Sequence, residues 1–155
     1  KNKFTLNLSG ADTIALEIAS RNVIERTKLL NKSCLMLKRK LQQHPSIKNL
    51  MHPENCQNFM KIKRPTGGFG CLLSFELHGG VNKAKFFYDN LKVSKGPSLG
   101  TNFTLVCPYV LLAHYDELKW ANTCGLSSNL IRVSVGLEDP SELWSRFKHV
   151  LDSLI

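Results

Sequence analysis

The chain has 155 residues, of which 43% are hydrophobic and 21% are charged. This composition is typical of a folded domain and excludes a disordered chain, and the length allows one ordinary domain but not two large ones. No apolar run approaches the length of a membrane span, and no N-terminal segment resembles a signal peptide, so we expect no membrane insertion. The chain does not begin with Met, and we expect it to be a fragment of a longer protein.

The formal net charge of +9 raises the question of an anionic partner, either nucleic acid or a charged surface. The basic residues are spread thinly, and the densest run, Lys38-Arg39-Lys40, lies at the end of a predicted helix, where cations complement the helix dipole. We therefore interpret the charge as a solvated face of a larger protein and expect no nucleic-acid partner. A basic interaction or nucleic-acid-binding module is the alternative from another functional class.

The five cysteines contain no closely spaced pair, which argues against a disulfide framework and a zinc knuckle. The five histidines have no metal-ligand spacing either, and the pair His52 and Cys56 stands alone. We therefore predict no metal site and a reducing, intracellular compartment. The expected location is the cytoplasm, with the nucleus as an additional compartment.

The first predicted element is a long helix over about 11–42. Ser9 and Asp12 have the spacing of a capping box, and the apolar residues that follow recur at steps of three and four, on one stripe: Leu16, Ala19, Val23, Thr27, Leu30, Cys34, Leu37 and Leu41. His44-Pro45 ends the helix, because the residue before proline is forced out of helical geometry. We assign 1–45 as a long inter-domain helix, because a helix of this length lies across a second body or links two.

From residue 46 the pattern changes to short strands and helices, and we assign 46–155 as one α+β domain. The elements that follow are a short strand or extended segment at 47–50, a strand at 71–77, a helix at 81–91, a short strand at 93–94, a tight loop at 95–100, a strand at 103–107 and a helix at 115–123.

The clearest strand runs from Leu130 to Val135, with Ile131, Val133 and Val135 on one face and Arg132 on the other. The last helix follows Asp139-Pro140-Ser141-Glu142, a start with Asp as the N-cap and proline in the first turn. The fold class is therefore α/β, with a small α+β domain. Its long helix precedes a roughly four-stranded, mostly antiparallel sheet that carries helices on one face, which leaves the other face free to cover something.

Two residues stand out as candidate ligand contacts. Arg132 is half-buried in a strand and needs an anion. The pattern alone favours an ion pair with Glu138 or Glu76, and the functional alternative is a bidentate contact with a substrate carboxylate, which suits the planar guanidinium. Ser98 lies in the tight loop and is interpreted from the pattern as a turn serine, with a ligand contact as the alternative.

Several blocks of the sequence resemble one enzyme family. The blocks are Lys95-Gly96-Pro97-Ser98-Leu99-Gly100, Cys107-Pro108-Tyr109, His114 and the segment 130–139, Leu-Ile-Arg-Val-Ser-Val-Gly-Leu-Glu-Asp. In order and spacing they resemble the C-terminal domain of the Cys/Met-metabolism enzymes that use pyridoxal 5'-phosphate (PLP). This family includes cystathionine γ-synthase, cystathionine lyases and O-acylhomoserine sulfhydrylases. The resemblance covers nearly the whole chain, and the loop is most similar to that of the fungal cystathionine γ-synthase branch.

The resemblance implies a fold-type-I architecture and a homotetramer. PLP would be bound mainly by a large domain upstream of Lys1, where it forms a Schiff base with a lysine, so this chain would hold no catalytic residue and be inactive alone. The implied reaction joins an O-acylhomoserine and cysteine to make cystathionine, a step of transsulfuration and methionine biosynthesis. By motif position, Arg132 would bind the substrate α-carboxylate, and Ser98 would lie near that carboxylate and the lysine.

Two positions depart from the family pattern. The residue before Ser-Leu-Gly is often Glu in the family and is Pro97 here, and the residue after it is often Gly and is Thr101 here. The family Glu helps to recognise the distal part of the substrate, and proline offers neither a charge nor an N–H. A lyase or a sulfhydrylase of the same family therefore stays open as the alternative activity.

Overall fold

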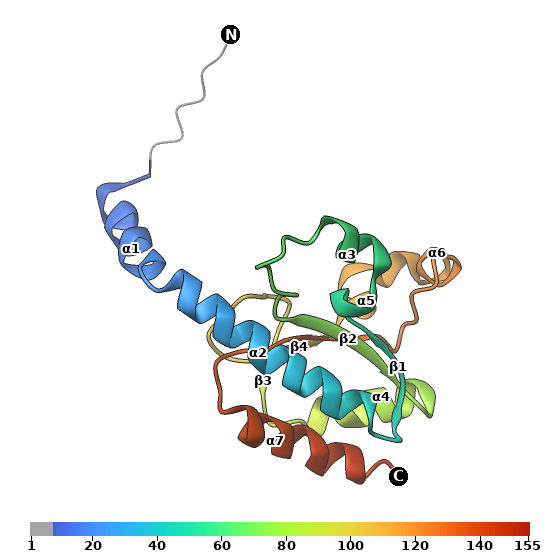
Figure 1. Cartoon of the computed structure of the whole chain (residues 1–155). Helices are drawn as coiled ribbons and strands as arrows, with labels where there is room; N and C mark the ends of the chain where they lie inside the picture. Colours follow the sequence, from blue (N-terminus) through green and yellow to red (C-terminus); the bar gives the residue numbers. More distant parts are fainter. Residues whose placement is uncertain (1–7) are drawn as a thin grey trace.

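A twisted sheet forms the centre of the domain in the computed structural model, which describes residues 8–155 (Figure 1). The strands are ordered β1-β2-β5-β4-β3, and all neighbours are antiparallel except the parallel pair β3 and β4. Their bounds are β1 (Ile47–Met51), β2 (Leu72–Leu77), β3 (Ser94–Lys95), β4 (Leu105–Pro108) and β5 (Ile131–Ser134). The expected fold class is confirmed, with five strands in the described residues, because the segment near 47–50 pairs with β2, with a register shift between Ile47 and Asn49.

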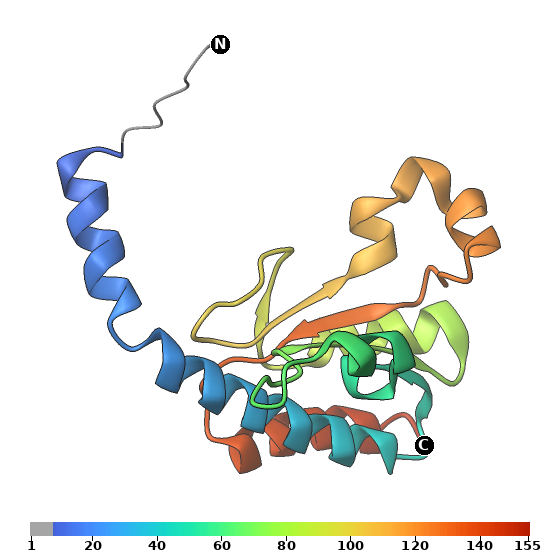
Figure 2. The same ribbon diagram turned by 45° about the horizontal axis from the view of Figure 1, so that its top comes forward.

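Three helices cover one face of the sheet, as Figure 2 shows from the side. They are α2 (Val23–Gln42), α4 (Gly80–Asn90) and α7 (Pro140–Asp152). Ile131 and Val133 of β5 are buried in the core that these helices share with the sheet. The start of α7 is confirmed, since the Asp139 side chain accepts hydrogen bonds from two backbone N–H groups, each at 2.9 Å. None of the helices in residues 8–155 has the length and apolar character that crossing a membrane requires.

Short helices lie around the other side of the sheet and at its edge (Figure 1). They are η1 (Pro53–Asn55), α3 (Gln57–Ile62), α5 (Tyr109–Ala113), η2 (Tyr115–Glu117) and α6 (Leu118–Thr123). A second, small cluster of buried residues, Val110, Ala121 and Leu130, holds this part together. The single helix expected over 115–123 is thus a 3-10 turn followed by α6, and α3 and α5 are additional.

The prediction of a single helix over 11–42 is wrong. Helix α1 (Gly10–Ser20) ends before Asn22, whose φ of −112° and ψ of 16° are not helical, and α2 then begins at Val23. No residue of α1 is buried, so no packing keeps the two helices in line, and α1 projects away from the domain (Figure 2).

The C-terminal half of the expected apolar stripe is buried, namely Leu30, Cys34, Leu37 and Leu41. The expected end of the helix is confirmed. His44 fixes the end of α2 to α7, because its Nε2 atom lies 3.1 Å from Oδ1 of Asp152 and its Nδ1 atom accepts the Ser46 N–H at 3.2 Å.

Candidate functional site

A row of side chains crosses the face of the sheet that α2, α4 and α7 leave free. Arg132 in β5 is paired with Ser74 in β2 and with Cys107 in β4, and Ser74 is paired with Met51 in β1. Paired residues of antiparallel strands point to the same face, and neighbours along one strand point to opposite faces. Arg132 therefore points away from the core that buries Ile131 and Val133, as its strand pattern predicted.

The guanidinium of Arg132 is held by neutral groups. Nη2 donates a hydrogen bond to the carbonyl oxygen of Pro97 and lies 3.4 Å from that of Ser98. The guanidinium carbon lies 5.3 Å from the centre of the Tyr109 ring, a cation–π distance. Its Nε atom is buried and has no hydrogen-bond partner among the described residues.

The prediction that Arg132 forms an ion pair with Glu138 or Glu76 is wrong. Glu138 accepts hydrogen bonds from the backbone N–H of Thr104 at 2.6 Å and from its hydroxyl at 2.8 Å. Glu76 lies 3.7 Å from the ammonium group of Lys48. Among residues 8–155, Arg132 forms no salt bridge with a carboxylate, so its charge is not neutralised within the described chain.

The loop between β3 and β4 carries Pro97 and Ser98 to Arg132. Gly96 donates a hydrogen bond to the carbonyl of Val106 at 3.1 Å, and Gly100, which has a φ of +72°, donates one to the Ser134 hydroxyl at 3.0 Å. These two bonds tie both ends of the loop to β4 and β5. The structure thus brings the two predicted site residues together, with the Ser98 carbonyl facing Arg132 and the Ser98 residue exposed.

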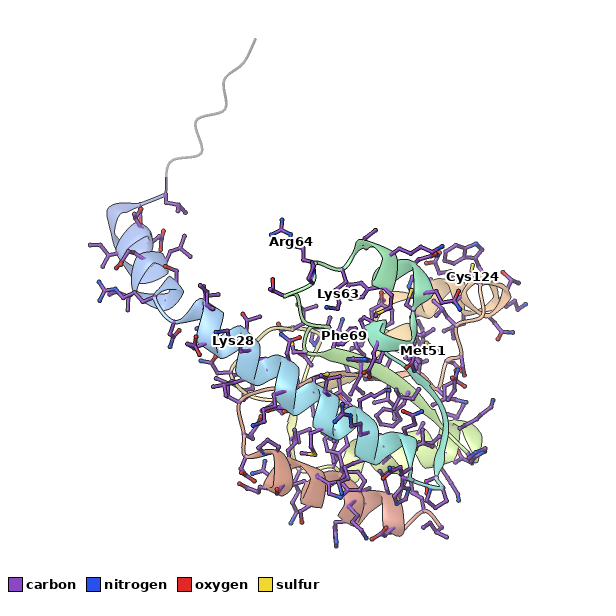
Figure 3. All side chains as sticks on the ribbon, in the orientation of Figure 1. Lys28, Met51, Lys63, Arg64, Phe69 and Cys124 are labelled. Atoms are coloured by element: carbon purple, nitrogen blue, oxygen red, sulfur yellow. The ribbon has the colours of Figure 1, made fainter. Side chains whose placement is uncertain are left out.

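Arg132 lies in the wall of an open cavity of about 520 Å³. The other lining residues come from four parts of the chain, and are Met51, His52, Pro53, Cys56, Leu72, Leu73, Ser74, Tyr109, Leu126 and Leu130. Figure 3 labels Met51 near the end of β1 and shows Arg64, on the loop before β2, extending away from the domain. Apart from Arg132 and the titratable His52, the described lining residues carry no charge, so Arg132 is the group in this wall that can bind an anion.

His52 forms a neutral part of this wall. Burial lowers its pKa, and the Lys38 charge adds to this against the opposing effect of Glu54. Nδ1 of His52 accepts the Glu54 N–H at 3.2 Å, which assigns the ring proton to Nε2, 3.8 Å from the sulfur of Cys34. Both ring nitrogens are therefore engaged inside the protein, and His52 is suited to shaping the cavity rather than to proton transfer.

The described residues do not form a metal site. Within residues 8–155, no group of three His, Cys, Asp or Glu side chains could hold a metal ion. Tyr109 and His52 were not predicted as site residues from the sequence. Strand order brings them to the cavity that Arg132 lines, because Tyr109 follows β4, a neighbour of β5, and His52 follows β1, which pairs with β2 on the other side of β5.

Comparisons with known proteins show the family to which the chain belongs. Residues 21–152 match the family model of the Cys/Met metabolism PLP-dependent enzymes. The chain is 46% identical to a cystathionine γ-synthase of Neurospora crassa, over 90% of this chain and 23% of the relative. It is 38% identical to a cystathionine γ-synthase of Saccharomyces cerevisiae, over 93% of this chain and 24% of the relative.

The fold is similar to the crystal structure of a cystathionine γ-synthase from Xanthomonas oryzae pv. oryzae in complex with aminoacrylate and cysteine. The TM-score is 0.75 at 22% sequence identity, covering 85% of this chain and 35% of the other. The chain therefore spans about a quarter of the length of the curated relatives that it matches.

Proposed function

Because the chain belongs to the Cys/Met metabolism PLP-dependent enzyme family, we propose that it is the small, substrate-binding domain of a cystathionine γ-synthase. The enzyme would join an O-acylhomoserine to cysteine and release the acyl group as a carboxylate. The observation that carries this proposal is Arg132, a cation on the open face of the sheet that forms no salt bridge within the described chain. The names of the fungal relatives support the choice of synthase.

Arg132 would bind the α-carboxylate of the amino-acid substrate. A guanidinium can donate to both carboxylate oxygens at once, and this fixes the amino acid about its α-carbon. The apolar wall of the cavity would exclude water from this ion pair and so strengthen it. Ser98, whose backbone already contacts Arg132, would lie beside the bound carboxylate and hold the loop against it.

The residues of the cavity fit a carboxylate better than they fit the cofactor. No lysine is among the described residues that line it, and PLP is carried by a lysine in this family. We therefore place the cofactor lysine upstream of Lys1, in a large domain that covers the open face of the sheet. When bound, PLP supplies an electron sink for reactions at the α-carbon of an amino acid.

The activity is tested on the complete gene product, purified with PLP. O-acetyl- and O-succinyl-L-homoserine are each supplied with L-cysteine, and L-cystathionine is measured by mass spectrometry. Cystathionine formation supports the synthase. Formation of homocysteine from an O-acylhomoserine and sulfide, without formation of cystathionine, would identify a sulfhydrylase. Cleavage of added cystathionine, without its formation, would identify a lyase. No reaction with any of these substrates would overturn the proposal.

The location of the cofactor is tested by borohydride reduction and peptide mapping. We expect one stoichiometric PLP adduct in the complete gene product, at a lysine outside residues 1–155. A stoichiometric adduct at a lysine of this chain would contradict the assignment.

We also propose that the complete gene product is a homotetramer, which light scattering would check. We propose that it is located in the cytoplasm, which fluorescence microscopy of the tagged gene product would check.

A further inference from the structure

Tyr109 connects the strand that precedes it to the strand that carries Arg132. It begins α5 directly after β4, and its backbone N–H donates a hydrogen bond to the carbonyl of Leu130 at 3.1 Å. This bond anchors Tyr109 to the start of β5, two residues before Arg132. The backbone position of Tyr109 relative to the strand that carries Arg132 is therefore set by the sheet.

The Tyr109 ring is itself supported from behind. Its centre lies 5.9 Å from that of the His114 ring, with an angle of 74° between the rings, an edge-to-face contact. Nδ1 of His114 lies 2.7 Å from Oε1 of Glu117, and the Trp120 ring lies 6.1 Å from His114. The side chains of His114, Glu117 and Trp120 thus pack behind the Tyr109 ring, and the Arg132 guanidinium lies over the ring itself.

The contacts of Arg132 decide which of its N–H groups stay available. A guanidinium has five N–H donors: one on Nε and two on each Nη atom. Nη2 donates to the Pro97 carbonyl and, over a longer distance of 3.4 Å, to the Ser98 carbonyl, while Nε is buried and has no partner among the described residues. The hydrogens on Nη1 have no such partner among the described residues, and a carboxylate that replaces the long Ser98 contact can accept from Nη1 and Nη2 at once.

We propose that Tyr109 is a positioning residue for the substrate carboxylate: its ring, together with the Pro97 carbonyl, holds the Arg132 guanidinium so that the Nη1 and Nη2 edge faces the ligand. The proposal rests on the function proposed above for Arg132. Arginine loses much side-chain freedom when it binds a ligand, and prior orientation of its planar group reduces that cost. Tyr109 thus acts on substrate affinity through Arg132.

The test compares three variants in the complete gene product, loaded with PLP. We expect Tyr109→Leu to raise KM for the O-acylhomoserine about tenfold and to change kcat less than about twofold, as for a loss of ground-state binding. Tyr109→Phe keeps the aromatic face and should stay within about twofold of the wild type in KM. Tyr115→Leu makes the same change at a tyrosine that is 69% exposed and is the matched control, with no expected effect. If Tyr109→Leu does not fold, Tyr109→Met, which is also unbranched at Cβ and lacks the ring, takes its place with the same expectation.

Arg132→Lys and the double variant separate this inference from the function on which it rests. In the Arg132→Lys background, Tyr109→Leu should raise KM by less than about twofold further, because its effect passes through the guanidinium. If Arg132→Lys leaves KM unchanged, the carboxylate-binding proposal itself fails. If Arg132→Lys raises KM but Tyr109→Leu alone does not, or if Tyr109→Phe is as impaired as Tyr109→Leu, the role of Tyr109 is overturned while that of Arg132 stands.

Discussion

Glu138 binds Thr104, with its two carboxylate oxygens accepting the Thr104 backbone N–H at 2.6 Å and hydroxyl at 2.8 Å. The same hydroxyl accepts the N–H of Gly136 at 2.9 Å. A side chain at Gly136 would collide with this arrangement, because its Cβ would lie 2.4 Å from the carbonyl carbon of Phe103. In the segment Arg-Val-Ser-Val-Gly-Leu-Glu, Gly136 and Glu138 thus fix the chain after β5, and Arg132 is left for a ligand.

Loss of Glu138 should therefore affect stability and not substrate binding. Glu138→Ala leaves two donors of the buried Thr104 unpaired, and we expect it to lower the free energy of unfolding by about 2–3 kcal/mol. KM for the O-acylhomoserine should stay within about twofold of the wild type. Melting temperature and KM are measured on the same preparation. A raised KM at an unchanged melting temperature would show that Glu138 serves the ligand site.

Loss of Lys38 and loss of Glu54, which form a buried ion pair, should lower the stability of the protein by different amounts. Their atoms Nζ and Oε2 are 3.0 Å apart, and the Lys38 side chain is 8% exposed against 31% for Glu54. Glu54→Gln leaves a buried, unpaired ammonium group and should cost about 3 kcal/mol of stability. Lys38→Met leaves a carboxylate that still reaches water and should cost less. Equal losses of melting temperature in the two variants would contradict this account of the pair.

His52 should make the protein sensitive to acid. Burial holds its pKa below the ordinary histidine value of about 6.5, so in the folded state it remains neutral at a pH where the unfolded chain binds a proton. The unfolded state then binds more protons, and stability falls as the pH drops below about 6.5. The melting temperature of His52→Gln should fall less between pH 7.5 and pH 5.5 than that of the wild type. His149→Gln, at an exposed histidine, should keep the wild-type pH dependence, and an unchanged slope in His52→Gln would refute the prediction.

Cys34 should be inert in the folded protein. Burial raises the pKa of its thiol to about 12, with a further contribution from Cys71, so almost no thiolate is present at pH 8. Iodoacetamide at pH 8 should modify the exposed Cys56 and Cys124 and leave Cys34 unmodified until the protein is unfolded. Peptide mass spectrometry after native and denatured labelling measures this. Alkylation of Cys34 in the native protein at a rate similar to that of Cys56 would contradict its burial.

Periodicity predicted the elements that are long or strongly patterned. The alternation of β5 placed Ile131 in the core and Arg132 on the opposite face, and Asp139 was identified as the cap of α7; all three are confirmed. The short helices α3 and α5 have too few residues to show a helical period. The break at Asn22 was missed because the apolar spacing continues across it, although no core is present there to bury α1.

The sequence pattern could place Arg132 on a face but could not choose its partner. Both candidate carboxylates are engaged elsewhere, Glu138 by Thr104 and Glu76 by Lys48, through contacts between distant parts of the chain. Tyr109 reaches Arg132 for a similar reason, because β4 and β5 are neighbours in the sheet while more than twenty residues separate the two side chains in sequence. Contacts of this kind depend on strand order, which local periodicity does not contain.

Arg132→Lys in the complete gene product tests the central claim most directly. Lysine keeps the charge but lacks the planar pair of N–H donors that can bind both carboxylate oxygens. We therefore expect a higher KM for the O-acylhomoserine and a fall in kcat/KM of about 10²-fold, equivalent to about 3 kcal/mol of transition-state binding. The melting temperature and the PLP content should stay close to those of the wild type, because Arg132 forms no salt bridge in residues 8–155 and the cofactor is assigned to another domain. Both quantities and kcat/KM are measured on one preparation. A lowered melting temperature with an unchanged kcat/KM would contradict the assignment of Arg132 to the substrate carboxylate.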